Sequence, residues 1–358
     1  METQNKKSKT LGTILFILAN ILIIGWTAFR EFSGGDGAER FRDVTIRWGF
    51  LIPALGCFCL AVAAETVKYA AVMKETSGYV DWRLARRTVL LGRYYDNITP
   101  SGIGGQPFQI YYLKKNGLSN AASAALPIAG FLSMQFSFIL LALVVLIAGG
   151  GSTQSTVVRV AAFVGLFFYS FFPVMILLFT LFPSFAERIT RTVTALLARL
   201  RLVKNEQQAV GRFIANVKDY SACLQMLLKD QKLCLKTLGL GLVYQIATCS
   251  IPFFVIFAFG GKVSFLDCLA TTTLIYAAIT FIPTPGNAGA AEGMFYAVFS
   301  MLTTGYIFWA MLLWRFFVYY LYIFVGLGLQ LDEILSKRLG VGRRLQAPAV
   351  IERENTEE

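Results

Sequence analysis

The sequence of 358 residues contains no histidine and few charged residues. The lack of histidine excludes Ser-His-Asp and Cys-His catalytic centres, a haem held by histidine and any zinc site that uses an imidazole. Six cysteines are present but none forms a CxxC pair, and most lie in apolar runs, where cysteine behaves as a small buried hydrophobic residue. The sequence therefore predicts no metal site, no disulfide framework and no cofactor.

Charged residues make up 15% of the chain, against about 25% in an ordinary globular protein, and hydrophobic residues make up 56%. Lysine and arginine number 33 against 21 acidic residues, which gives a net charge of +12. In a chain this apolar, such a basic balance favours an anionic membrane surface over nucleic acid. The composition predicts an integral membrane protein.

Long apolar runs are the main structural signal, since about 20 apolar residues cross the hydrocarbon core of a membrane as a helix. Two further segments, 94–117 and 265–301, are apolar but interrupted by proline and glycine. The predicted fold class is an all-α integral membrane protein with six to eight transmembrane helices, depending on whether the broken segments are re-entrant or cross fully. The six uninterrupted runs are 11–29, 48–73, 121–148, 157–182, 238–259 and 306–329.

The distribution of lysine and arginine predicts that both termini face the cytoplasm, because cytoplasmic loops carry the excess of basic residues. The first broken segment is then entered from the cytoplasm and the second from outside, which suggests an inverted repeat. The expected organisation is a basic tail, a first membrane half, a basic amphipathic cytoplasmic segment, a second membrane half and a charged tail, at residues 1–10, 11–182, 183–236, 237–329 and 330–358.

The broken segments carry the most specific local pattern. Residues 97–109 read NITPSGIGGQPFQ, and residues 283–292 read PTPGNAGAAE. Lipid cannot hydrogen-bond to the backbone groups that proline and glycine release, so such segments persist only inside protein or beside a water-filled cavity. Their corresponding places in the two halves predict a transporter site at a repeat interface. The alternative is that they are kinks or tight turns between spans.

Helices that begin after Gly105 and after Gly286 would present free N–H groups and a positive dipole end to a phosphate, such as that of a phospholipid headgroup. Proline and glycine would shape these half-helices, and the amide side chains would contact the headgroup. The aromatic residues of the last span are expected to be packing residues without a ligand. The predicted substrate path consists of Asn97, Thr99, Pro100, Gly104, Gly105, Gln106, Gln109, Pro285, Gly286, Asn287, Gly289, Glu292 and Arg315.

Charged residues inside the apolar segments are costly, at about 2.5–3.5 kcal/mol each near the membrane centre. Glu292 and Arg315 are expected to pair, either with Arg315 facing a lipid phosphate or as a structural ion pair that holds the half-helix against the last span. Glu65 and Lys68 lie one helical turn apart and are expected to neutralise each other. Asp96 is predicted to be either a gate or an interface anchor.

The motifs Asn97-x-x-Pro100, Gly104-Gly105-Gln106-Pro107-x-Gln109, Pro285-Gly286-x-x-Gly289-x-x-Glu292 and Trp314-Arg315 resemble the lysylphosphatidylglycerol synthase transmembrane-region family, over about residues 11–330. In full-length relatives this module is a flippase that moves aminoacylated phosphatidylglycerol to the outer leaflet and gives resistance to cationic peptides. The resemblance implies a flippase for phosphatidylglycerol or its lysyl form in a bacterial plasma membrane. Its implied partners are an anionic phospholipid and a separate lipid synthase.

Two departures from the family pattern matter. Only residues 330–358 follow the last span, where full-length relatives carry a cytosolic synthase domain, so aminoacyl transfer by this chain alone is not expected. Gln106, Gln109 and Gln135 stand where many relatives carry acidic and arginine residues, so the headgroup is expected to differ. Three hypotheses stay open: a flippase, a phosphatidylglycerol lysyltransferase or its membrane subunit, and a membrane scaffold or regulator. Homo-oligomer formation is also left open.

Overall fold

The computed structural model describes residues 45–148, 156–182, 220–280, 282, 284–303 and 306–338. The first predicted span (11–29), residues 183–219 of the basic segment and the tail after 338 lie outside the described residues. The described part folds into ten α-helices and contains no strand. The predicted all-α class is therefore confirmed for this part of the chain.

The α-helices are α3 (Leu51–Ser77), α4 (Trp82–Ile98), α5 (Gly105–Lys115), α6 (Asn120–Ile147), α7 (Thr156–Leu181), α10 (Gln231–Ala258), α11 (Phe265–Ile279), α12 (Ala290–Leu302), α13 (Ile307–Arg315) and α14 (Leu321–Arg338). Short 3₁₀ segments are η1 (Trp48–Phe50), η2 (Pro100–Gly102) and η3 (Pro285–Asn287), and η4 (Phe316–Tyr320) is a π-helical turn. Residues 220–229 are also helical.

Five helical stretches are long and apolar enough to cross a membrane. They match the five predicted runs that fall within the described residues. Their bounds are Trp48–Ser77, Asn120–Ile147, Arg159–Leu181, Gln231–Ala258 and Ile307–Ser336. The observed α10 begins before the predicted start at Leu238, and the last stretch extends beyond Leu329, because polar residues at helix ends continue the hydrogen-bonded turns that the apolar run starts.

Side-chain caps define where several helices begin. Asp81, Ser119, Asp230 and Ser264 each accept a hydrogen bond from a backbone N–H of the first turn that follows. Such caps satisfy donors that have no partner within the helix. At its other end, α3 stops at Gly78, whose left-handed backbone (φ 74°) closes the last turn. The helix bounds thus follow from local polar residues at the ends of apolar runs.

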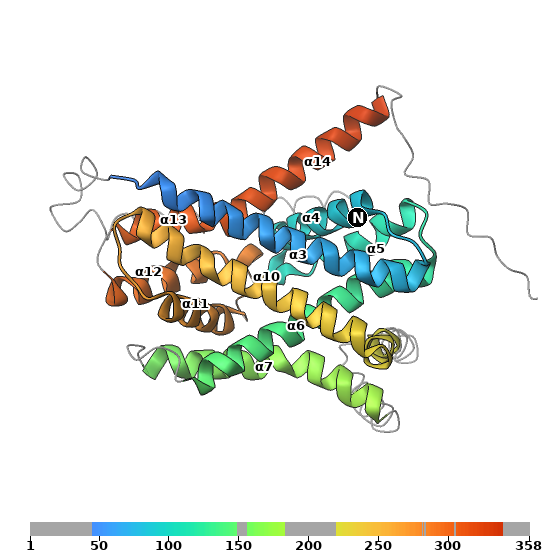
Figure 1. Ribbon diagram of the computed structural model, residues 1–358, viewed down its shortest axis with the longest axis horizontal. Coiled ribbons are helices and arrows are strands. Elements are labelled where there is room, and N and C mark those ends of the chain that lie inside the picture. Colours follow the sequence, from blue (N-terminus) through green and yellow to red (C-terminus); the bar gives the residue numbers. More distant parts are fainter. Residues whose placement is uncertain are drawn as a thin grey trace, which may run out of the picture.

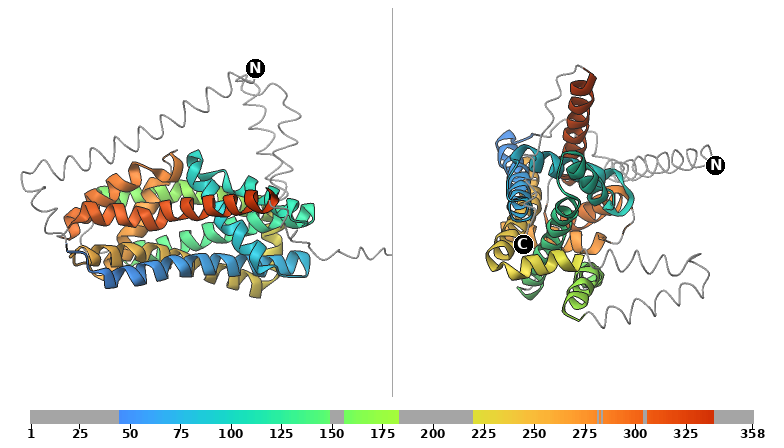
Figure 2. Two further views of the ribbon diagram at one scale, coloured as in Figure 1. Left: turned by 90° about the horizontal axis from the view of Figure 1, so that it is seen from above. Right: turned by 90° about the vertical axis from the view of Figure 1, so that its right-hand side faces the viewer.

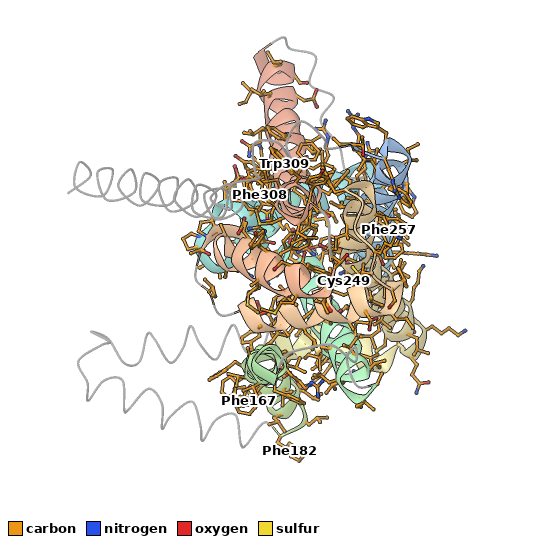
Figure 3. The ribbon with its side chains drawn as sticks, turned by 90° about the vertical axis from the view of Figure 1, so that its left-hand side faces the viewer. Phe167, Phe182, Cys249, Phe257, Phe308 and Trp309 are labelled. Carbon is orange, nitrogen blue, oxygen red and sulfur yellow. The ribbon has the colours of Figure 1, made fainter. Side chains whose placement is uncertain are left out.

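The long helices lie roughly alongside one another (Figures 1 and 2). Helix α3 packs along α10, α6 contacts both, and α7 packs against α6 and α11. The outer face of α7 carries exposed phenylalanines, including Phe163, Phe167 and Phe171. Figure 3 shows Phe167 at the edge of the bundle and Cys249 of α10, which is fully buried, inside it. An apolar outer face of this kind is suited to lipid rather than water.

Each predicted broken segment forms a helical hairpin with its interruption at the tip. Helices α4 and α5 pack together at one end of the bundle, and α11 and α12 pack together at the other (Figure 1). The two tips, η2 and η3, contact each other. The first hairpin begins at Trp82, earlier than predicted, because residues 82–93 belong to α4 and not to a polar loop. The basic residues there lie on an amphipathic helix, which a hydropathy average reads as a loop.

The last long helix is interrupted by the π-helical turn η4, which directly follows Arg315. The sequence pattern predicts an unbroken span here. A π-helical turn inserts an extra residue into a helix and often occurs at functional sites. Tyr319 in this turn is buried, as are Arg315 directly before it and Tyr322 after it, so the interruption lies among polar side chains that face the interior of the bundle.

Candidate functional site

A cavity of about 910 Å³ lies where the two hairpin tips meet. Residues from both tips line it, including Asn97 and Gln106 from the first and Gly286 and Asn287 from the second. Helices α3, α6, α7, α10 and α11, Tyr220, and the stretch of the last long helix from Arg315 to Tyr322 complete its walls. One cavity therefore brings together the two broken segments that the sequence places far apart.

The lining differs from helix to helix. Helices α6 and α7 contribute mainly apolar groups, such as Phe131, Phe138 and Phe172. Helices α3, α4 and α10 contribute polar groups, including Glu65, Tyr69, Arg93, Tyr244 and Gln245. The cavity is therefore amphipathic, as a site for a molecule with a polar head and an apolar tail would be.

The predicted path residues divide into two groups. Asn97, Gln106, Gln109, Gly286, Asn287 and Arg315 line the cavity. The others do not line it and instead build or cap the hairpin tips. These are Thr99, Pro100, Gly104, Gly105, Pro285, Gly289 and Glu292.

The first tip is held by side-chain caps. Asp96 Oδ1 accepts a hydrogen bond from the Gly105 backbone N–H at 2.8 Å, and Thr99 Oγ1 accepts one from Gly104 at 2.9 Å. A Cβ at Gly105 would lie 2.3 Å from Asp96 Oδ1, so only glycine permits this approach. One of the α5 N–H groups that were expected to be free for a phosphate, that of Gly105, is therefore bound within the protein. Asp96 is a helix cap that also lines the cavity.

The second tip is held by a buried ion pair. Arg315 Nε donates to Glu292 Oε1 at 2.5 Å, and Arg315 Nη2 donates to the Gly286 carbonyl at 3.1 Å. Glu292 Oε2 accepts from the Gly289 N–H at 2.6 Å. The two side chains are 3–4% exposed. The predicted pairing is confirmed, and its structural role is evident, since it ties α12 to the last long helix. Arg315 also lines the cavity.

Three positions of the second tip have a positive φ angle. Gly286 has φ of 58°, Asn287 has 53° and Gly289 has 92°. Glycine and asparagine tolerate this region best. Helix α12 consequently begins at Ala290, whereas the sequence predicted a start directly after Gly286.

Glu65 and Arg93 form a second ion pair at the cavity wall. Arg93 Nε and Nη2 donate to the two Glu65 oxygens at 3.1 and 3.0 Å, and the guanidinium lies 4.8 Å from the Tyr244 ring centre. Lys68 donates instead to the Gly130 carbonyl at 3.2 Å. Glu65 therefore forms its direct ion pair with Arg93 and not with Lys68, because the planar guanidinium matches a carboxylate at two points and approaches from another helix.

Tyr319 joins the two tips. Its hydroxyl donates to the Asn97 carbonyl at 3.2 Å, and Asn97 Nδ2 donates to the Tyr319 carbonyl at 3.5 Å. Its ring packs so closely on Gly286 that a Cβ there would lie 2.2 Å away. The sequence pattern predicted no site role for this tyrosine. The spacing of four residues between Arg315 and Tyr319 could have indicated a site role, since positions four apart share a helix face.

The glutamine side chains differ in whether they already form hydrogen bonds with other groups of the protein. Gln109 accepts from Tyr69 Oη at 2.8 Å and donates to the Thr88 carbonyl at 3.3 Å. Gln106 accepts from Tyr220 Oη at 2.8 Å. Gln135 on α6 is 9% exposed, and its Oε1 has no hydrogen-bond partner within the described part of the chain. In the sequence, Gln135 stands out only as a departure from the family pattern.

A profile of the lysylphosphatidylglycerol synthase TM region family matches residues 11–326. The chain belongs to this family. The match spans both hairpins, the cavity and Arg315, so the site is built entirely from the shared region. A UPF0104 membrane protein of Pyrococcus horikoshii is 22% identical, over 78% of this chain and 85% of the relative. The resemblance inferred from the motifs is therefore confirmed at the level of the family, as a multi-pass membrane protein.

Proposed function

We propose that the protein is a lipid transporter that moves a phospholipid such as phosphatidylglycerol, or its lysyl form, between the leaflets of a bacterial plasma membrane. The observation that carries this proposal is the amphipathic cavity bounded by both hairpin tips. An anionic phospholipid is the proposed ligand, and a separate synthase is the proposed source of the lysyl form. A contribution to cationic peptide resistance would follow from placing that lipid in the outer leaflet.

A lipid changes leaflets only if its headgroup crosses the hydrocarbon core, where unsatisfied polar groups are costly. Polar side chains of α3, α4 and α10 would replace the water of the headgroup, while the phenylalanines of α6 and α7 would face the acyl chains. Both arginines of the lining are in ion pairs, Arg93 with Glu65 and Arg315 with Glu292, so their charges are stable away from water.

Alternating access supplies the motion. In this proposal the two hairpins are re-entrant segments entered from opposite faces, both termini are cytoplasmic, and the halves form an inverted repeat of six to eight spans. Rocking of one repeat against the other around a site at mid-membrane is the usual mechanism of such transporters. The Asn97–Tyr319 hydrogen bonds, at 3.2 and 3.5 Å, join the first tip to the turn η4, and a motion of that tip against the last long helix would have to break them.

A bulky substitution on one face of α10 should block the cavity. Thr248 lines the cavity on α10, whereas Ile246 on the same helix is 39% exposed and does not line it. We expect Thr248→Trp to slow lipid movement at least about tenfold, or roughly 1.4 kcal/mol in the barrier, because the indole fills the path. Ile246→Trp is the matched control and should transport normally.

The measurement is a leaflet-scrambling assay in liposomes that contain labelled phosphatidylglycerol or lysyl-phosphatidylglycerol. Folding of each variant is checked by its thermal unfolding midpoint in detergent. Equal rates for the two tryptophan variants would show that lipid does not use the cavity. No movement of either lipid by the folded wild-type protein would overturn the transporter proposal for these lipids.

A further inference from the structure

We infer that the cavity selects its lipid by the hydroxyl groups of the headgroup, as in a polyol or a sugar, and not by a phosphate or an ammonium group. This inference rests on the proposed function, since it names the ligand class of the same cavity. It follows from which polar groups of the lining are already used by the protein and which are not.

The charged side chains of the lining already bind other groups of the protein. Four charged side chains face the cavity: Glu65, Arg93, Asp96 and Arg315. Glu65 and Arg93 bind each other at two points, Asp96 caps α5, and Arg315 binds Glu292 and the carbonyl of Gly286. A phosphate would compete with these carboxylates for the two arginines, and an ammonium would compete with the arginines for the carboxylates.

Neutral groups that both donate and accept hydrogen bonds dominate the rest of the polar lining. They are the amides of asparagine and glutamine and the hydroxyls of tyrosine and threonine. Some are tied within the protein, as Gln109 is to Tyr69 and Thr88. Others face the cavity: Gln135, Gln245 and Asn287 all line it.

Gln135 is the sharpest observation. Its side chain is buried, lines the cavity, and has an Oε1 atom without a hydrogen-bond partner in the described residues. Buried polar atoms are nearly always paired, so an unpaired one beside a cavity points to a ligand group that pairs with it. An amide has a donor end and an acceptor end, whichever way it is turned.

Hydroxyl groups fit this amide better than the alternatives do. A hydroxyl both donates and accepts, so two neighbouring hydroxyls satisfy both ends of the amide at once. A phosphodiester only accepts and an ammonium only donates, so either group alone leaves one end of the amide unpaired. Gln245 on α10, which is also 9% exposed, offers a second amide of the same kind.

Lipid retention measured by native mass spectrometry tests this selectivity without any transport step. The purified protein is offered equal amounts of four lipids with identical acyl chains: monoglucosyl-diacylglycerol, phosphatidylglycerol, phosphatidic acid and phosphatidylethanolamine. We expect the first two to be retained about tenfold more than the last two, the factor that one or two hydrogen bonds provide. Phosphatidic acid isolates the phosphate, and the glucosyl lipid isolates the hydroxyls.

Variants assign the selectivity to Gln135. Gln135→Leu keeps the size of the side chain and should reduce the preference to less than about twofold, while Gln135→Glu, which only accepts, should shift it toward phosphatidylethanolamine. Ser133→Ala on the same helix is the control, because the Ser133 hydroxyl donates to the Ala129 carbonyl and does not line the cavity.

The outcomes separate this inference from the proposed function. Equal retention of phosphatidic acid and the hydroxyl-bearing lipids, or an unchanged preference in Gln135→Leu, would overturn the inference even if the protein moves lipid. Selective retention without movement in the liposome assay would instead support the inference and contradict the transporter proposal. Retention of the glucosyl lipid but not phosphatidylglycerol would identify a sugar as the headgroup. Retention of phosphatidylglycerol but not the glucosyl lipid would show that the phosphate is required and would overturn the inference.

Discussion

Replacing Arg315 by methionine is expected to lower the free energy of unfolding by about 3–5 kcal/mol, the usual cost of breaking a buried ion pair by removing one partner. Arg315 is 4% exposed, and its loss leaves the Glu292 carboxylate buried without its cation. The Gly286 carbonyl loses its donor as well. The second hairpin tip should therefore loosen, and lipid movement should fall to the background rate.

The double variant Glu292→Gln, Arg315→Met separates charge from packing. Glutamine keeps an acceptor for the Gly289 N–H but removes the unpaired charge, so the double variant should be more stable than Arg315→Met alone. Arg159→Met is the matched control, because Arg159 is exposed at the start of α7. Denaturant titration in detergent measures the three variants. If Arg315→Met alone is as stable as the wild type, the Glu292–Arg315 pair does not hold the second tip.

Replacing Gly165 by alanine is expected to have the second largest effect. A Cβ at Gly165 on α7 would lie 1.9 Å from the Ala277 carbonyl oxygen on α11, a backbone atom that cannot rotate away. The two helices would have to move apart, because small residues at helix contacts in membranes are what allow the backbones to approach closely. We expect a loss of about 1–3 kcal/mol in stability, the usual cost of overpacking.

The effect should reach the cavity, since Tyr169 on α7 and Tyr276 on α11 both line it close to this contact in sequence. Lipid movement should therefore change together with the thermal unfolding midpoint. Gly239→Ala on α10 is the control, because a Cβ there meets nothing within 4 Å and alanine favours the helix. If both alanine variants unfold at the wild-type temperature, the close approach of α7 and α11 is not a feature of the folded protein.

The spans and the breaks could be predicted because their causes are local. A run of about 20 apolar residues reads directly as a helix of membrane length, and five described helices match such runs. Pro100 and Pro285 interrupt helices by removing an N–H and clashing with the preceding turn, so the positions of η2 and η3 follow from residue type. The Glu292–Arg315 pair was also predictable, since few charges lie in the second half.

The remaining site residues depend on contacts between distant segments, which periodicity does not reveal. Arg93 lies in a basic stretch and looks like a cytoplasmic residue, yet it binds Glu65 inside the bundle. Asp96 was ambiguous because its partner, the Gly105 N–H, is set by the fold of the tip. Gln135 sits in an apolar run, where nothing in the sequence distinguishes a cavity wall from a packed interface.

Photolabelling with a lipid that carries a diazirine in its headgroup tests most directly whether the headgroup enters the cavity. The protein is labelled in liposomes and the adducts are mapped by mass spectrometry. Adducts are expected on cavity-lining segments deep in the bundle, around Thr248 of α10 and Gln106 of α5, and they should diminish in Thr248→Trp. Adducts confined to the ends of the long helices, with the protein folded, would contradict a headgroup path through the cavity.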